Sequence, residues 1–333
     1  MNSRDSLPGA TKPILAVKDL VKHFTLRGSW PAGSTRVVPA VDGISFELPA
    51  TRTLGLVGES GCGKSTTAKL VLQLEEPDSG EIRIDGELAT RAGRSATKRL
   101  RRKAQMVFQD PYASLTPHLR IGSILREPFL VHRICARNEI AQRVAALLVA
   151  VGLHPNVAQR FPHELSGGQR QRVGIARAIA IEPQLVICDE PVSALDVSIR
   201  SQIINLLLDL QASRGLAYLF ISHDLDLVEH VSDAVAVIHL GRIVEQASTA
   251  MFFAGPRHPY SRALLASSPV PDPHRRAKPA IAGEVPRATE LSSGCRFRNR
   301  CPFAVPRCSE ADPVLRPIGN GHLVACHRAE EIV

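Results

Sequence analysis

Residues 53–66 read TLGLVGESGCGKST, an apolar run followed at once by a glycine-rich turn. The apolar run is typical of a strand buried on both faces, and residues 65–73 have the pattern of a helix. The turn fits G-x-x-x-x-G-K-[ST], in which backbone amides surround phosphate oxygens at positions where a Cβ atom would interfere. The sequence therefore predicts a strand, a phosphate-binding loop and a helix in succession.

Each part of this loop has an expected task. Lys64 can neutralise the charge of the β- and γ-phosphates, and the Ser65 hydroxyl is placed to ligate Mg²⁺. The helix that starts near Lys64 adds its positive N-terminal end. We therefore take the whole loop as nucleotide-binding: Gly58, Glu59, Ser60, Gly61, Cys62, Gly63, Lys64, Ser65 and Thr66.

A second apolar run, residues 185–190, ends in two carboxylates, Asp189 and Glu190. We expect Asp189 to hold Mg²⁺ through its water shell and Glu190 to polarise the water that attacks the nucleotide. Adjacent acidic residues at a strand end are often only exposed to solvent. Asp189 and Glu190 become strong evidence for a nucleotide-hydrolysing site because they follow the phosphate loop in the expected order.

Leu165-Ser-Gly-Gly-Gln169 begins another predicted helix, with Ser166 as a suitable N-cap. Its two glycines, Gly167 and Gly168, leave backbone amides open to an anion. A chain with two such helix ends builds a composite site only if both face one nucleotide or if two chains exchange them.

The remaining pattern indicates an α/β fold. Residues 14–50 alternate as antiparallel strands do, residues 82–88 suggest another strand, and residues 91–180 are mostly helical, with a clear amphipathic stretch at 140–151. Short apolar runs separated by helical sequence predict a parallel sheet with crossover helices, and these runs are 185–188, 216–221 and 234–239. After Gly255 the sequence becomes rich in Pro, Arg and Cys, and we place a domain boundary there.

Composition indicates a globular chain without a membrane span of its own. Of 333 residues, 44% are hydrophobic and 22% charged, and no apolar run approaches the roughly 18–20 residues of a span. The start of the chain lacks the apolar centre of a signal peptide, so we expect a cytoplasmic location and membrane contact through partners. Despite the net charge of +9, aromatics are only 4%, which gives little material for stacking bases. We expect no nucleic-acid partner and interpret the basic run 98–103 as a solvated helix face.

Taken in order, these motifs resemble those of ATP-binding-cassette (ABC) ATPases, over roughly residues 14–333. Residues 58–66 stand as the P-loop, 165–169 as the signature, Asp189-Glu190 as Walker B and residues 193–196 as the D-loop. His223 matches the switch histidine, and Gln109, within residues 106–110, matches the Q-loop glutamine. The resemblance implies a P-loop ATPase core with an antiparallel β subdomain and a helical subdomain over residues 14–255, followed by a small cysteine-containing extension, 256–333.

The resemblance also implies roles. Two subunits pack head to tail, so that the P-loop of one and Ser166 and Gln169 of the other close on the same ATP, with Asp196 at the interface. Glu190, His223 and Gln109 form the catalytic set: His223 steadies the γ-phosphate and the water, and Gln109 senses Mg²⁺ and links to the transmembrane partner. Phe24 stands where the family commonly has the aromatic that stacks on adenine, although a core phenylalanine is the rival interpretation.

Two segments resemble one branch, the ATPases of di- and oligopeptide importers. Residues 109–117 are similar to the stretch that faces the permeases, and residues 258–265 to the His-Pro-Tyr segment that opens the C-terminal extension. The Pro-Tyr-Ala-Ser form at 111–114 is more like the second ATPase of such systems. The resemblance implies two permease subunits, a non-identical second ATPase, an indirect link to a substrate-binding protein, and a peripheral place on the cytoplasmic face of the inner membrane. Nickel, glutathione and antimicrobial peptides are alternative cargoes. A soluble cassette protein acting on ribosomes or DNA is the rival class, but those usually carry two cassettes or large inserted arms.

Four cysteines crowd the end of the chain: Cys295, Cys301, Cys308 and Cys326. The close C-x-x-C pairs of zinc ribbons are absent. Peptide-importer ATPases carry a similar quartet, and the resemblance assigns it to a [4Fe–4S] cluster with four cysteine ligands. Zn²⁺ or reduced structural thiols are the alternatives, and we interpret the neighbouring His322 and His327 as bystanders.

Overall fold

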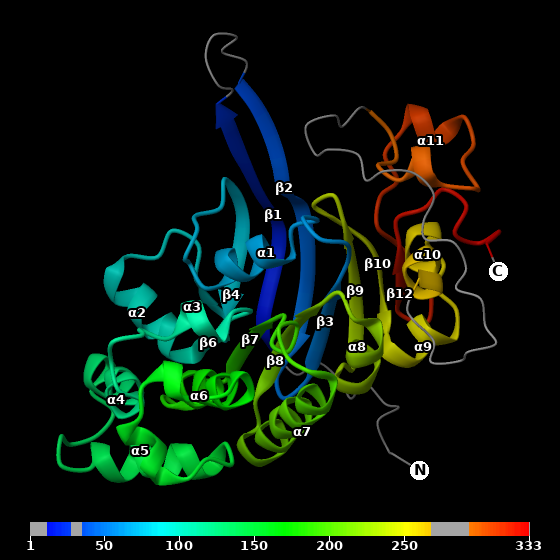
Figure 1. Ribbon diagram of the computed structural model, residues 1–333. Coiled ribbons are helices and arrows are strands. Elements are labelled where there is room, and N and C mark those ends of the chain that lie inside the picture. Colours follow the sequence, from blue (N-terminus) through cyan, green and yellow to red (C-terminus); the bar gives the residue numbers. More distant parts are fainter. Residues whose placement is uncertain (1–11, 28–34, 268–292, 333) are drawn as a thin grey trace.

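The computed structural model describes residues 12–27, 35–267 and 293–332. Two β-sheets and a group of helices make up this part of the chain, with a C-terminal unit beside one end of the larger sheet (Figure 1). Residues 268–292 and 333 of the predicted extension lie outside the described residues.

The smaller sheet is antiparallel, as the alternation over residues 14–50 predicts. Its strand order is β2-β1-β4-β5, and in the pairing of its two long strands Leu15 faces Leu48 and Val17 faces Phe46. The single strand expected over 82–88 is a hairpin instead, because Asp85 and Gly86 both have positive φ angles, of 51° and 75°, which suits a tight hairpin turn. The strands are β1 (Pro13–Arg27), β2 (Thr35–Pro49), β4 (Ser79–Ile84) and β5 (Glu87–Leu88).

The larger sheet has the order β11-β12-β10-β9-β3-β8-β7-β6. Its strands from β9 to β6 are parallel, which confirms the predicted parallel sheet, whereas β10, β12 and β11 are antiparallel additions. Every residue of β3, β7 and β8 is buried, as expected for parallel strands covered on both faces. The bounds are β3 (Thr53–Val57), β6 (Ala104–Val107), β7 (Leu185–Asp189), β8 (Ala217–Ser222), β9 (Ala234–His239), β10 (Arg242–Ser248), β11 (Arg316–Gly319) and β12 (His322–Val324).

The expectation that residues 91–180 are mostly helical missed one strand. β6 is only four residues long and consists of Ala, Gln, Met and Val, three of which favour helices in isolation. It is a strand because it pairs in parallel with β7, with Met106 opposite Ile187. Tertiary pairing has overridden local preference here.

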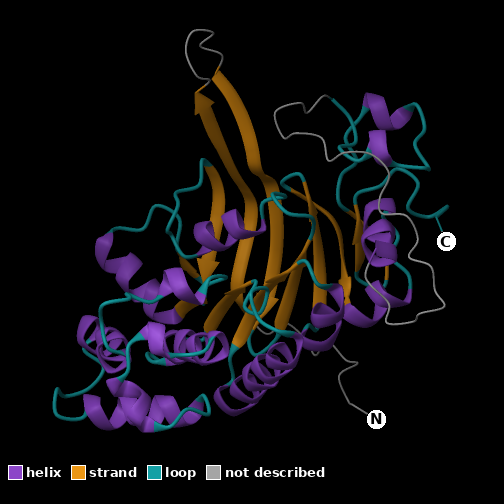
Figure 2. Cartoon of the chain, viewed as in Figure 1, coloured by secondary structure: helices purple, strands orange, loops and turns teal. Residues whose placement is uncertain are grey.

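Most helices cover the larger sheet on the side away from the antiparallel sheet (Figures 1 and 2), whereas α1 and α2 contribute Leu70 and Leu100 to the core on the other side. The amphipathic stretch predicted at 140–151 is helix α5. The α-helices are α1 (Lys64–Val71), α2 (Arg94–Lys103), α3 (Pro111–Ser114), α4 (Ile121–His132), α5 (Ile140–Ala150), α6 (Gly167–Ile179), α7 (Val197–Arg214), α8 (Leu225–Val231), α9 (Thr249–Ala254), α10 (Pro259–Ser267) and α11 (Arg307–Glu310). Short 3₁₀ turns occupy Pro155–Gln159, Pro162–Glu164 and Arg298–Arg300.

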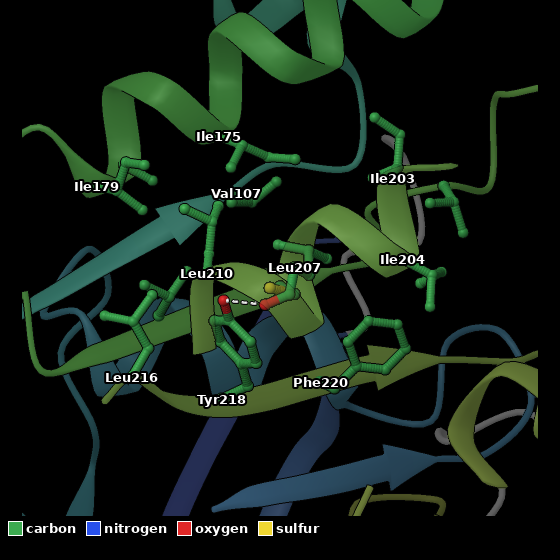
Figure 3. Close-up of a cluster of buried hydrophobic side chains, with 14 of the residues drawn as sticks. Val107, Ile175, Ile179, Ile203, Ile204, Leu207, Leu210, Leu216, Tyr218 and Phe220 are labelled. Atoms are coloured by element: carbon green, nitrogen blue, oxygen red, sulfur yellow. Dashed lines mark hydrogen bonds between the residues drawn. The ribbon is translucent and has the colours of Figure 1, made fainter. Parts of the chain in front are cut away.

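Two hydrophobic cores result, one on each face of the larger sheet. Neighbouring residues Val186 and Ile187 of β7 belong to different cores, because successive side chains of a strand point to opposite faces. In one core, Ile175 and Ile179 of α6 and Leu207 and Leu210 of α7 face Tyr218 and Phe220 of β8 (Figure 3). This packing fixes the strand ends from which the site is built.

The basic run 98–103 lies on α2 with most of its side chains exposed, and only Leu100 of this helix is buried. Lys103 forms ion pairs with Asp85 and Glu87, which lowers the pKa of both carboxyls. The interpretation of this run as a solvated helix face is confirmed. In the described ranges, no helix combines the length and the apolar character needed to cross a lipid bilayer.

Candidate active site

The glycine-rich loop follows β3 and leads into α1, in the predicted order. Gly63 caps the helix with φ at 112°, and a Cβ there would lie 2.1 Å from the carbonyl oxygen of Ala40. A Cβ on Gly58 would lie 2.2 Å from the carbonyl oxygen of Ile238. The glycines are therefore required by the close packing of the loop on β2 and β9, in addition to any approach of a phosphate.

Lys64 carries a positive charge into the interior of this loop. It is 5% exposed, and its Nζ donates to the carbonyl oxygens of Gly58 at 2.8 Å and Glu59 at 2.9 Å. The Lys64 ammonium is buried and held only by neutral groups, and burying an unpaired charge is costly. An anion that binds beside it would therefore be stabilised by this charge. The loop, the lysine and the helix end together fit the phosphates of a nucleotide.

Cys62 faces the interior of the loop. Its Sγ accepts from Lys64 Nζ at 3.7 Å, it is 4% exposed, and burial raises the pKa of its thiol. Its carbonyl oxygen accepts a hydrogen bond from Gly241 N at 2.9 Å, which ties the loop to the turn between β9 and β10. Any contact of this residue with nucleotide is therefore expected through its backbone.

Ser65 and Asp189 meet as the proposed Mg²⁺ site requires. The Ser65 hydroxyl donates to Asp189 Oδ1 at 3.0 Å, across the gap between α1 and the end of β7. Asp189 is 5% exposed, and its burial raises the pKa of its carboxyl. A hydroxyl and a carboxylate are hard oxygen ligands, and a cation beside Asp189 would restore its ionised form.

The Glu190 carboxylate lies between the two other predicted catalytic residues. Gln109 Nε2 donates to its Oε2 at 2.9 Å, and its Oε1 lies 3.2 Å from His223 Nδ1. Glu190 follows β7, and His223 follows the adjacent strand β8. Glu190 has φ at 45°, a left-handed conformation that is uncommon for residues other than glycine and that concentrates at functional sites.

The signature residues begin α6 and contact the start of α7. Ser166 Oγ accepts from Gln169 N at 3.3 Å, and Gln169 Oε1 accepts from Ser166 N at 3.1 Å, so the predicted N-cap is a full capping box. A Cβ on Gly168 would lie 2.6 Å from Ile199 Cγ2, and one on Gly167 would lie 3.3 Å from Leu195 Cδ2. Gly167 and Gly168 thus permit the close packing of α6 against Leu195 and Ile199, and they also leave their backbone amides open to an anion. Asp196 is exposed at the start of α7.

Phe24 lies on β1, half-buried, with Lys22 Nζ 5.4 Å from its ring centroid. It belongs to neither of the two hydrophobic cores formed by the described residues. Its ring is therefore not a core side chain of this fold.

Comparison with known proteins identifies the chain. Residues 41–193 match a family model described as ABC transporter, and residues 244–308 match one for the C-terminal region of oligopeptide/dipeptide transporters. A probable peptide ABC transporter ATP-binding protein of Sinorhizobium fredii is 48% identical, over 94% of this chain and 89% of its own length. The chain belongs to the ABC transporter ATP-binding proteins of the oligopeptide/dipeptide family. The oligopeptide transport ATP-binding protein AppF of Bacillus subtilis is 46% identical, over 94% of this chain and 97% of its own length.

Solved structures of ABC proteins share the fold. A dimeric ATP-binding cassette, MJ0796, bound to ADP and phosphate, has a TM-score of 0.63 at 25% identity and covers 71% of this chain and 98% of its own. The cbiO1 subunit of a Clostridium perfringens ABC transporter has a TM-score of 0.62 at 29% identity, over 73% of this chain and 92% of its own. The predicted cassette fold is thus confirmed. The chain is an ABC-type ATPase, an enzyme class that acts on ATP with Mg²⁺.

In this ABC ATPase, all four late cysteines line one pocket, together with His258, Phe297 and His327. Burial raises the pKa of Cys295 to about 11 and also raises those of Cys301 and Cys326. Over the described ranges, no group of three or more His, Cys, Asp or Glu side chains is arranged to hold a metal ion. His322 is turned away to Glu245, with Nε2 2.6 Å from Oε1, as expected of a bystander.

Sequence reasoning missed two residues that reach the phosphate loop, Tyr260 and Arg300. Both contact Glu59. The His-Pro-Tyr segment marks the family in sequence, but nothing local to it reveals a contact with a loop 201 residues away.

Proposed function

We propose that this chain is the ATP-hydrolysing subunit of a membrane importer that takes up di- or oligopeptides through separate permease subunits. The proposal rests on two features that occur together in this chain, a set of residues suited to ATP hydrolysis and the C-terminal region of peptide transporters. Ser65, Asp189, Glu190, Gln109 and His223 form a connected set suited to hydrolysis, and the same chain carries the C-terminal region of oligopeptide/dipeptide transporters.

We propose a role for each of these residues, supported by the contacts described above. Lys64 and the amides of Gly58–Thr66 hold the phosphates, Phe24 stacks on the adenine, and Ser65 with Asp189 holds Mg²⁺, with Gln109 near it. Glu190 orients and polarises the attacking water, a role that typically contributes about 10²–10⁴ in rate. His223, whose Nδ1 lies 3.2 Å from Glu190 Oε1, steadies the γ-phosphate and the water. The cation supplies charge neutralisation between the phosphate oxygens.

A second subunit completes the site in this proposal. Ser166 and Gln169 are more than 90 residues from the phosphate loop in sequence, and no hydrogen bond among the described residues joins the two segments. The exposed Asp196 and Val197, the latter 76% exposed, offer a surface for the partner cassette. We propose a non-identical partner, on the similarity of residues 111–114 to the second ATPase of peptide importers.

The permease contact is proposed for the groove beside Gln109. This groove begins at Ser65 and Asp189 of the proposed Mg²⁺ site and extends past Gln109 to a wall that includes Phe108, Glu127 and Val131. Phe108 is 39% and Val131 is 49% exposed, which gives the groove apolar surface that a partner can cover. We propose that the chain sits peripherally at the cytoplasmic face of the inner membrane, with a substrate-binding protein acting on the far side.

We also propose that the four-cysteine pocket holds a [4Fe–4S] cluster. Its donor chemistry is suitable, because four thiols line one pocket and Arg298 and Arg328 at its wall would offset thiolate charge. Protein purified without oxygen is expected to contain iron and to absorb broadly near about 400 nm, as thiolate-bound clusters do. Stoichiometric zinc without iron would replace this assignment with a zinc site, and neither metal would leave four structural thiols.

The function as a whole is tested by purifying the tagged chain with its partners from membranes under anaerobic conditions. Recovery of two permeases and a second cassette ATPase is the expected result. Ribosomal proteins or nucleic acid in their place would keep the ATPase and overturn its transport role. Association with a nickel or glutathione permease would correct the cargo alone.

A further inference from the structure

Two side chains of the C-terminal region converge on one residue of the phosphate loop, Glu59. The hydroxyl of Tyr260 accepts a hydrogen bond from Glu59 N at 2.9 Å. Arg300 donates through both terminal nitrogens to the Glu59 carboxylate, at 2.9 Å and 2.8 Å. We propose that Tyr260 and Arg300 are positioning residues that hold the phosphate loop in its ATP-binding conformation. This inference rests on the proposed role of residues 58–66 in binding ATP.

Both contacts are partly withdrawn from water, because the Glu59 side chain is 22% exposed. Tyr260 is fully buried, and the side chain of Arg300 is 5% exposed. The Arg300 Nε has no hydrogen-bond partner among the described residues, so the hydrogen bonds made by this guanidinium go to Glu59. A two-point pair of arginine with carboxylate fixes direction as well as distance, which one flexible lysine contact would not do.

Tyr260 is itself held by a group of aromatic rings, those of His239, His258 and Phe297, here called the aromatic block. The Tyr260 ring lies 4.2 Å from that of His239 and 5.4 Å from that of Phe297, measured between centroids. Tyr260 N donates to His258 Nδ1 at 3.1 Å, and His258 N donates to the buried Glu245 at 3.0 Å. Tyr260 therefore connects β10 and the aromatic block directly to the phosphate loop.

Fixing Glu59 also fixes Lys64. The carbonyl oxygen of Glu59 is one of the two acceptors of Lys64 Nζ. Glu59 is thus held on three sides: its amide by Tyr260, its carboxylate by Arg300 and its carbonyl by Lys64. Releasing the first two is expected to let the loop sample conformations that bind phosphate poorly. Loss of these two contacts is expected to weaken mainly the affinity for ATP, because neither Tyr260 nor Arg300 contacts Glu190 or His223 in this structure.

Arg300 and the aromatic block also connect the phosphate loop to the cysteine pocket. Arg300 directly precedes Cys301, and Phe297 lines both the aromatic block and that pocket. The C-terminal region is in this sense part of the ATP site and not only an appendage.

Tyr260→Phe is the sharpest test, because it removes one oxygen atom and keeps the packed ring. The Kd for a fluorescent ATP analogue should rise about fivefold to tenfold, which corresponds to about 1.0–1.4 kcal/mol. Tyr218→Phe is the matched control: its buried hydroxyl donates to Leu207 O at 2.8 Å (Figure 3), and no hydrogen bond among the described residues joins this hydroxyl to residues 58–66. That variant should lose similar thermal stability with unchanged ATP affinity.

Arg300→Gln tests the ion pair, with Arg316→Gln as its control. Arg316 makes a two-point pair with Glu330 in the same region, with side chains that are 41% and 58% exposed, and this pair does not involve the loop. We expect Arg300→Gln to raise the Kd for ATP about tenfold, or about 1.4 kcal/mol, and Arg316→Gln to leave it unchanged. The double variant Glu59→Gln/Arg300→Gln should bind no worse than Glu59→Gln alone, because the two residues act through one contact.

Lys64→Ala separates this inference from the assignment beneath it. If Lys64→Ala abolishes ATP binding while Tyr260→Phe and Arg300→Gln match their controls, the positioning role is wrong and the phosphate loop stands. If Lys64→Ala binds ATP normally, the loop assignment itself fails.

Discussion

Gln109 and Glu190 are joined by a hydrogen bond of 2.9 Å between Nε2 and Oε2, although 81 residues separate them in the chain. Gln109 lines the groove proposed for the permease, and Glu190 is the proposed catalytic carboxylate. This one hydrogen bond therefore connects the groove proposed to bind the permease with Glu190, the residue proposed to polarise the attacking water. If the proposed roles hold, a movement of Gln109 would change the hydrogen bond that it donates to Glu190.

Glu190→Gln should stop turnover without preventing ATP binding. The amide keeps the shape of the side chain but cannot take up a proton, so phosphate release should fall by about 10²–10⁴. Filter binding with labelled ATP should show retained nucleotide. Glu229→Gln, an exposed position on α8, is the control and should behave as wild type. Wild-type turnover in Glu190→Gln would contradict the assignment.

Asp189→Asn should raise the Mg²⁺ concentration needed for half-maximal ATP hydrolysis. Residues that hold a metal through its outer shell typically contribute 10- to 100-fold in affinity, so a shift of about that size is expected. A Mg²⁺ titration at saturating ATP measures it, and Ser65→Ala should act in the same direction. The exposed Asp209 provides the control Asp209→Asn. An unchanged Mg²⁺ requirement in both site variants would move the metal elsewhere.

Phe24→Ala and Phe46→Ala should separate binding from folding. Phe24 is half-buried and outside both cores, so its loss should weaken ATP binding while leaving the unfolding midpoint nearly unchanged. Phe46 is 4% exposed in the core of the same sheet, and its truncation should cost about 3–5 kcal/mol of stability. Urea unfolding and nucleotide titration of the two variants give the answer. A large stability loss in Phe24→Ala would restore the core interpretation.

Acidification from pH 7 to pH 5 should destabilise the fold through buried histidines. Burial lowers the pKa of His258 to about 4, against the opposing effect of Glu245, and that of His239 to about 3. In this pH window the unfolded chain binds a proton at each histidine and the folded chain does not, so stability falls as pH falls.

His258 alone should account for about 2 kcal/mol at pH 5. His258→Asn keeps an acceptor for Tyr260 N but does not titrate, so the difference between the urea midpoints at pH 7 and pH 5 should shrink in this variant. The exposed His118 supplies the control variant His118→Asn, whose pH dependence should equal that of wild type. An undiminished pH dependence in His258→Asn would mean that other groups cause it.

Sequence alone predicted the parts of the site whose chemistry depends on local spacing. The order of Lys64, Ser166, Asp189 and His223 along the chain is enough to recognise a cassette, because each motif contains its own glycines, hydroxyls or carboxylates. The strand ends that bring Asp189 and His223 beside the loop follow from the predicted parallel sheet. The N-cap predicted at Ser166 is equally local, and the structure adds the Gln169 side chain that completes a capping box.

What sequence could not predict depends on long-range contacts. β6 is a strand only because β7 lies beside it. β12 pairs with β10 from within a Pro- and Arg-rich segment that has no strand-like alternation. The contacts of Glu59 with Tyr260 and Arg300 span 201 and 241 residues, and no sequence motif indicates that these residues meet. Gly168 has a second role, the approach of Ile199, that its motif does not show.

Peptide uptake by reconstituted vesicles tests the central claim most directly. The chain, assembled with its permeases and partner ATPase in proteoliposomes, should take up a labelled oligopeptide in the presence of the binding protein, external peptide and internal Mg-ATP. Uptake should require ATP hydrolysis and should fall to background with Glu190→Gln. Hydrolysis that continues normally without any peptide uptake, or uptake that is unaffected by Glu190→Gln, would contradict the account.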